Sequence, residues 1–235
     1  MRNLRWAWAA LTAVLLGYGF YQAMYVAPTE ATMGNIQRIF YYHVSAWLGM
    51  GVFFAVNLCA SIVYLAARRS NPLRALGADA LALASAEMGV VFCTVGLVTG
   101  SLWARPVWGI WWTWDERLTS TLLLYLIYIS YLLLRRFADG DQMRTLAAVL
   151  AIFGYLDVPI VYFSTRWFRT QHPGPVIGTG NLDASMWPPL LWNWAAWLAW
   201  GILLTSLRYN IERRRQMAEQ RAALHSLEAT LELTK

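Results

Sequence analysis

Charge, cysteine and histidine are all scarce in this sequence. Of its 235 residues, 14% are charged, two are cysteine and three are histidine, and lysine occurs once, at Lys235. Neither Cys59 nor Cys93 belongs to a C-x-x-C pair, so the chain has no C-x-x-C-H attachment motif and is not itself a c-type cytochrome. The absence of a G-x-x-x-x-G-K-[ST] loop means that any ATP hydrolysis must come from a partner. We expect both cysteines to be buried apolar filler.

Apolar residues, by contrast, are abundant: 58% of the chain is hydrophobic and the mean hydropathy is +0.40. Six apolar stretches each have roughly the 17 to 25 residues that a tilted helix needs to cross the hydrocarbon of a bilayer. They cover residues 6–26, 44–67, 80–103, 118–134, 146–163 and 190–207. The composition therefore predicts an all-α integral membrane protein with six transmembrane helices.

The basic residues are unevenly distributed over the expected connections. Of the 19, 14 fall in the termini and the even-numbered connections, which by the positive-inside rule makes both termini cytoplasmic. We expect residues 1–207 to form the six-span domain and residues 208–235 to form a cytoplasmic tail that is an amphipathic helix. The net charge of +6 is thus mostly a topology signal and does not indicate nucleic-acid binding.

A tryptophan-rich stretch, residues 103–119, lies between the third and fourth spans and is expected on the outer face. It reads WARPVWGIWWTWDERLT and holds five tryptophans within twelve residues. If this stretch is helical, Trp108, Trp111 and Trp112 share one face, and the helix would lie flat at the level of the lipid headgroups, where tryptophan settles. One interpretation is therefore an interfacial anchor.

Several acidic residues lie at or inside the expected spans. The group from Thr113 to Glu116, which includes Asp115, fits a capping box that opens the fourth span. Glu87 falls inside the third span, where an ionisable group is either functional or an internally paired structural residue. Asp157 lies two residues before Pro159 in the fifth span, and the proline is expected to bend that helix.

The histidines and arginines of the outer face suggest a metal site. His43 and His172 are expected there in different loops, and imidazoles from separate loops can clamp a haem from its two sides. Each histidine taken singly also has a structural explanation. The tryptophan-rich stretch would cover the ring, and arginine suits the anionic propionates. The arginines on that face are Arg38, Arg105, Arg117, Arg166 and Arg169.

Three motifs of this sequence resemble the cytochrome c maturation protein C (CcmC) family. They are W-G-x-W-W-x-W-D-x-R-L-T at 108–119, G-N-I-Q-R-I-F-Y-Y-H-V-S-A-W at 34–47 and Y-L-D-V-P-I-V-Y-F-S at 155–164. The resemblance implies a haem delivery protein, not an enzyme, that binds haem b at the outer face of the bacterial inner membrane. It also implies three partners besides membrane lipid: a membrane-anchored haem chaperone, an ATP-driven (ABC) transporter and a small single-span helper subunit.

The family's two ligand histidines correspond to His43 and His172, and its tryptophan-rich domain to residues 103–119. The candidate cofactor-binding residues are thus His43, His172, Trp103, Trp108, Trp111, Trp112, Trp114, Asp115, Arg117, Arg38 and Arg105. Two other functions stay open: a membrane b-type cytochrome, and a subunit without haem whose tryptophan-rich loop docks other membrane proteins. The first usually holds haem between histidines inside the spans, and these spans have none in their interiors.

Overall fold

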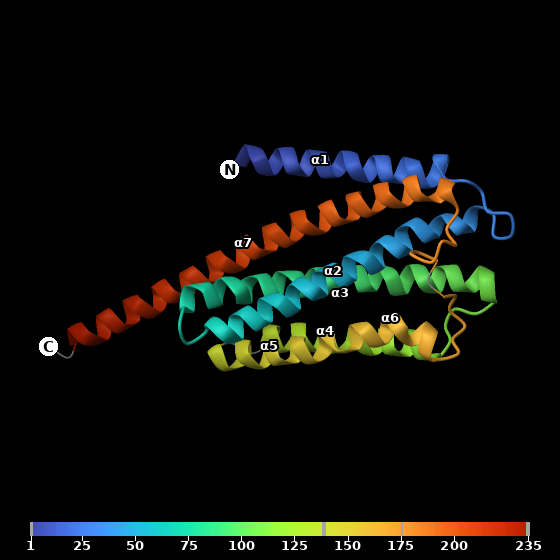
Figure 1. Cartoon of the computed structure of the whole chain (residues 1–235). Coiled ribbons are helices and arrows are strands. Elements are labelled where there is room, and N and C mark those ends of the chain that lie inside the picture. Colours follow the sequence, from blue (N-terminus) through green and yellow to red (C-terminus); the bar gives the residue numbers. More distant parts are fainter. Residues whose placement is uncertain (1, 138–139, 175, 234–235) are drawn as a thin grey trace.

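The structure is a computed structural model that describes residues 2–137, 140–174 and 176–233, and this part of the chain forms a helical bundle (Figure 1). Lys235, the last residue of the predicted tail, lies outside the described residues. The α-helices are α1 Arg2–Tyr21, α2 Ile39–Ala67, α3 Pro72–Trp108, α4 Glu116–Phe137, α5 Asp141–Tyr155, α6 Asp157–Trp167 and α7 Trp187–Leu233. A π-helical turn, Gln22–Val26, extends α1, and short 3₁₀ helices, Asn35–Arg38 and Ala184–Met186, precede α2 and α7.

Six helical segments of the described chain are long and apolar enough to cross a membrane, which confirms the predicted number. The fifth consists of α5 and α6, with a single break at Leu156. Because Pro159 has no N–H, the carbonyl of Tyr155 lacks its usual helical partner, and the helix is interrupted just there. The prediction that Pro159 disturbs this span is therefore confirmed.

The bundle is organised around α2 and α3, which pack against each other along most of their lengths. Helices α4, α5 and α6 lie on one side of this pair, and α1 and α7 run on the other (Figure 1). Aromatic contacts fill the centre, where the ring of Phe54 on α2 stacks on that of Tyr128 on α4 at 3.6 Å. The Asn193 amide of α7 donates to the Gly19 carbonyl at 2.9 Å and joins α7 to α1.

Both ends of the chain lie at the same end of the bundle, as an even number of spans requires (Figure 1). The opposite end carries the connections between α1 and α2, α3 and α4, and α6 and α7. We call it the loop end. The residues of the predicted haem site all belong to this end, so the fold gathers them from distant parts of the sequence.

Helix α7 has 47 residues and is continuous across the predicted boundary at residue 207. At 1.5 Å per residue it is about 70 Å long. Its final part extends beyond the other helices (Figure 1). The division into a six-span domain and a tail stays a prediction, but a change of secondary structure does not mark it. His225, in this extension, is exposed and lies 3.6 Å from Glu228.

Buried polar contacts hold the helices together at the end away from the loops. Arg135 of α4 donates to both carboxylate oxygens of buried Asp79 on α3, at 2.7 and 3.0 Å. Glu87 pairs with Arg208 of α7 at 2.7 Å, which agrees with the internally paired structural interpretation, while a functional role stays a prediction. The expectation for the cysteines is half right, because Cys93 is buried whereas Cys59 is exposed on the surface of α2.

Candidate functional site

His43 lies in the second turn of α2 and not in a loop, which corrects the prediction from the sequence. The predicted span began at residue 44, but the last backbone break before it is at Gly34, whose φ is +57°. From Asn35 onward no proline or glycine interrupts the chain until Gly49, and the helix starts at Ile39. The imidazole is therefore fixed to a 29-residue helix, and the residue is only 7% exposed.

Both ring nitrogens of His43 have hydrogen-bond partners. Nδ1 lies 3.0 Å from the hydroxyl of Thr99, which donates its own proton to the Val95 carbonyl at 2.6 Å. Trp47 donates its indole N–H to Nε2 at 2.9 Å. This network assigns the proton to Nδ1 and the lone pair to Nε2.

Two glycines of α3 make room for these rings. A Cβ added at Gly100 would lie 3.0 Å from Cε1 of His43, and one at Gly96 would lie 2.8 Å from the indole of Trp47. Such contacts are too close for a side chain to be present without displacing the rings. The spacing of four residues places both glycines on one face of α3, directly beneath the α2 side chains.

His172 comes from the irregular connection between α6 and α7. Its Nδ1 lies 2.8 Å from the Pro173 carbonyl, so Nδ1 carries the proton and Nε2 holds a lone pair. The Trp108 ring lies edge-on to the imidazole, with the ring centroids 6.4 Å apart. A carbonyl bonded to Nδ1–H is a common way for a protein to orient an imidazole that binds a metal through its other nitrogen.

The two imidazoles lie side by side, although 129 positions separate them in the sequence. Their ring centroids are 6.5 Å apart and their planes are inclined by 28°. Metal–imidazole bonds are about 2 Å long, so this separation suits one metal ion bonded to both rings. Burial and the positive charge of Arg117 lower the pKa of His172 to about 4. His172 is therefore neutral near pH 7, as a metal ligand must be.

Asp115 connects the start of α4 to the loop of His172. One carboxylate oxygen accepts from the Leu118 N–H at 2.9 Å and caps α4, and the other accepts from the Gln171 N–H at 3.0 Å. Helix α4 starts at Glu116, so Asp115 is the N-cap and the predicted capping box beginning at Thr113 is wrong. Aspartate is one of the strongest N-caps, and Thr113 instead donates to its carboxylate at 3.3 Å.

The tryptophan-rich stretch does not form a helix that lies flat. Helix α3 continues to Trp108 and ends at Gly109, whose φ of +78° suits glycine alone, and the Arg105 guanidinium donates to the Gly109 carbonyl. Trp108, Trp111 and Trp112 consequently do not share a helical face. The stretch divides by exposure, because Trp111 is 55% exposed and Trp114 is 76% exposed.

Trp103 and Trp112 are only partly exposed. The Trp103 ring lies 5.8 Å from that of His43, measured between centroids. The Trp112 ring lies edge-on to Trp114, with centroids 5.8 Å apart. The structure thus brings Trp103 and Trp108 to the imidazoles and leaves Trp111 and Trp114 at the surface.

Among the arginines, Arg117 best fits the predicted role of a cation that binds haem propionates. It is half-buried, and its charge acts on both imidazoles. Among the described residues its guanidinium forms no hydrogen bond or close ion pair, although the charge of Asp115 acts on it. The Nε atom of Arg38 is buried and also lacks a partner among these residues, whereas Arg105 is exposed and bonded to its own helix end. Arg117 and Arg38 are thus available to an anion.

These groups fit haem better than a simple metal ion. Among the described residues no three histidine, cysteine or acidic side chains meet in a metal-binding group, and a structural zinc site needs four ligands. Haem iron takes only its axial ligands from the protein, because the porphyrin supplies the rest. Three buried donors of the loop end lack partners in the described chain and could donate to propionates, and one of them belongs to Trp103, whose ring adjoins His43. They are Arg38 Nε, Trp103 Nε1 and Trp112 Nε1.

Three contributors to the site were not assigned a role from the sequence: Trp47, Thr99 and Gln171. A spacing of four residues between His43 and Trp47 would have indicated their contact, had residue 43 been recognised as helical. Nothing in the sequence indicates that Thr99 and Gln171, each 56 residues from its partner, would approach His43 and Asp115.

The fold and site define the class: a multi-pass membrane protein in which two imidazoles and an arginine meet at the loop end of a six-span bundle. The particular family follows from comparison with known proteins. The chain belongs to the family described as heme exporter protein C, whose model matches residues 1–223.

Relatives of this family occur in bacteria and in plant mitochondria. The chain is 40% identical to heme exporter protein C of Bradyrhizobium diazoefficiens, with 91% of this chain and 81% of the relative aligned. It is 32% identical to heme exporter protein C of Escherichia coli K12, over 89% of this chain and 82% of the relative. A putative cytochrome c biosynthesis ccmC-like mitochondrial protein of Arabidopsis thaliana is 34% identical, over 88% and 75% respectively.

Proposed function

We propose that this protein binds haem b between His43 and His172 and delivers it, at the outer face of the bacterial inner membrane, to a membrane-anchored haem chaperone. As a member of the heme exporter protein C family it takes part in haem delivery for cytochrome c maturation. It is a transport component and not an enzyme. The site residues, the type of haem and the partner are our proposal.

One observation carries the proposed site: imidazoles from α2 and from the α6–α7 connection lie 6.5 Å apart, and the charge of Arg117 acts on both of them. Asp115 acts on the charge of Arg117 but forms no ion pair with it, so the guanidinium can still take an anionic ligand. Bound haem supplies an iron ion that accepts two axial imidazoles and two propionates that accept hydrogen bonds. Arg117 and Arg38 would pair with the propionates through charge-assisted bonds.

We assign the tryptophans to two roles, one at the haem site and one at the surface. Trp103 and Trp108 lie against the two imidazoles and exclude water from the site. Trp111 and Trp114 are exposed on the connection between α3 and α4, where a partner can reach them. Exposed aromatic side chains are common anchors of protein interfaces. We therefore assign Trp111 and Trp114 to the contact with the haem chaperone.

The proposed orientation places the loop end outside and both termini in the cytoplasm, as the distribution of basic residues predicts. Energy for delivery would come from an ABC transporter in the same complex, assisted by a small single-span subunit. The exposed apolar surfaces of the helices face lipid or these partners.

The test is haem content in purified protein. Wild type, His43→Ala and His172→Ala are purified in detergent and their absorption spectra recorded. We expect a Soret band with a bis-imidazole spectrum in the wild type, and a lost or shifted spectrum in each mutant. His225→Ala is the control, because this exposed histidine lies far along α7. Unchanged spectra in both outer mutants would reject the proposed ligands.

A further inference from the structure

We propose that Trp47 is an internal competitor of haem iron, because its indole N–H binds the nitrogen of His43 that the iron would need. This inference rests on the proposed function and adds to it a residue that limits how firmly haem is held. Trp47 would have to move when haem binds, and its return to His43 would favour release.

The hydrogen bonds of His43 determine which nitrogen is available. Nδ1–H points to the Thr99 hydroxyl at 3.0 Å, and that hydroxyl is already a donor to the Val95 carbonyl at 2.6 Å. Nδ1 is thus the protonated nitrogen, and only Nε2 has a lone pair for a metal. Trp47 Nε1, which can only donate, lies 2.9 Å from this lone pair. Iron and Trp47 cannot use the same lone pair at once.

The surroundings of Trp47 show which contacts its indole would give up on leaving His43. Trp47 follows His43 by one helical turn and meets its ring edge-on, with centroids 5.7 Å apart. On the other side the indole rests against Gly96, which has no side chain to interlock with it. The residue is only partly buried. To free Nε2, the indole would have to rotate out of its contacts with Gly96 and with the apolar cluster between the helices.

The two imidazoles differ in whether their Nε2 atom already accepts a hydrogen bond. The described residues offer no hydrogen-bond partner for Nε2 of His172, since the bond of that ring is made by Nδ1 to Pro173. His172 is ready to bind, whereas His43 first exchanges one bond for another. His172 would therefore be the readier of the two ligands for haem, and Trp47 would compete for His43.

The experiment compares wild type with Trp47→Phe in lipid nanodiscs. Haem is titrated into each apoprotein, and its transfer to apomyoglobin is timed. Removal of one competing hydrogen bond should tighten haem binding roughly fivefold and slow the transfer by a similar factor. The bis-imidazole spectrum should be unchanged. Trp200→Phe is the matched control: this α7 tryptophan is also partly buried but packs on Phe92, and its loss should leave both values unchanged.

A second substitution guards against loss of folding. Benzothienylalanine at position 47 replaces only the indole N–H by sulfur and should also tighten binding. In the apoprotein, nitrogen NMR of the His43 ring should report loss of the bond to Nε2 in both variants. Haem binding that is unchanged or weaker in both would overturn the inference. A wild type that binds no haem would instead overturn the proposed function.

Discussion

Among single side chains, Arg117 is the cation whose charge acts on both imidazoles. If it pairs with a propionate, Arg117→Gln removes a charge-assisted hydrogen bond worth about 2 kcal/mol. Haem affinity should then fall roughly 30-fold. Titration of the purified apoprotein with haem, followed in the Soret region, measures this.

The control for Arg117 uses both the protein and the ligand. Arg105→Gln should leave haem affinity near the wild-type value, because Arg105 is exposed and bonded to Gly109. Haem dimethyl ester carries no propionate charge, so wild type and Arg117→Gln should bind it about equally. A full loss of affinity for the ester in Arg117→Gln would mean that the arginine acts on the fold and not on the propionates.

At this scale the sequence predicted the kinds of residue well and their contacts poorly. His43, His172 and Arg117 were selected because few residues of their type occur on the loop end, and the structure does bring them together. Their role as haem contacts stays a prediction. The bond from Trp47 to His43 was not foreseen, because it depends on α2 starting at Ile39.

At the scale of helices, Asp115 has two structural roles, and one substitution removes both. Asp115→Ala removes the N-cap of α4 and the bond to Gln171 that tethers the loop of His172. Loss of the cap should lower the free energy of unfolding by about 1 kcal/mol. Loss of the tether should weaken haem binding, because His172 is no longer held in place.

Thermal unfolding and haem titration measure the two effects of Asp115→Ala separately. Glu116→Gln is the matched control, since this neighbouring acid is exposed and is not the cap. Haem affinity that stays at the wild-type value while stability falls would show that Asp115 only caps α4.

Helix existence was predictable because long apolar runs are strong signals, whereas helix ends depend on single residues. Gly109 ends α3 within the tryptophan-rich stretch. The tryptophans spaced i, i+3, i+4 in that stretch therefore do not line one face of a helix. Asp115, and not Thr113, is the N-cap of α4. Local patterns permitted both outcomes in each case: the glycine conformation at Gly109 ended α3, and the Asp115 cap also bonds the distant Gln171.

For the whole molecule, the arrangement of helices allows a direct test of the predicted membrane topology. The two termini share one end of the bundle, so a single orientation assigns every connection (Figure 1). A reporter active only outside the cytoplasm should be inactive when fused after the last residue and active when inserted after Gly180, in the α6–α7 connection. Activity of the first fusion and silence of the second would invert the proposed orientation.

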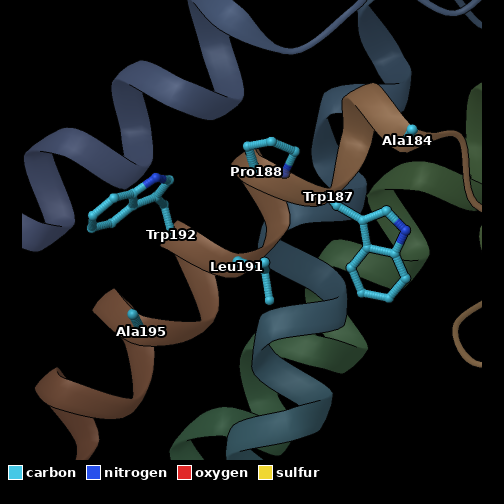
Figure 2. Close-up of a pocket in the computed structure, with 6 residues that line it drawn as sticks. All are labelled: Ala184, Trp187, Pro188, Leu191, Trp192 and Ala195. Carbon is cyan, nitrogen blue, oxygen red and sulfur yellow. The ribbon is translucent and has the colours of Figure 1, made fainter.

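An apolar groove of about 490 Å³ also belongs to the whole-molecule view, because it opens on the surface beside α1 (Figure 2). It is lined by Ala184, Trp187, Pro188, Leu191, Trp192 and Ala195. Trp187 also packs in the cluster that contains Phe40 and Trp103. The groove therefore adjoins the packing behind the imidazoles without containing either of them.

The uninterrupted course of α7 has a mechanical consequence. A bilayer's hydrocarbon is about 30 Å thick, and this helix is about 70 Å long, so a large part of it stands clear of the lipid. The pair of Arg208 with Glu87 fixes the rod to α3 near its middle. Beyond that pair, Gln216 donates to Asp79 of α3 and Glu219 lies 3.5 Å from Arg144 of α5. Among the described residues, the projecting arm of the rod therefore begins beyond Glu219.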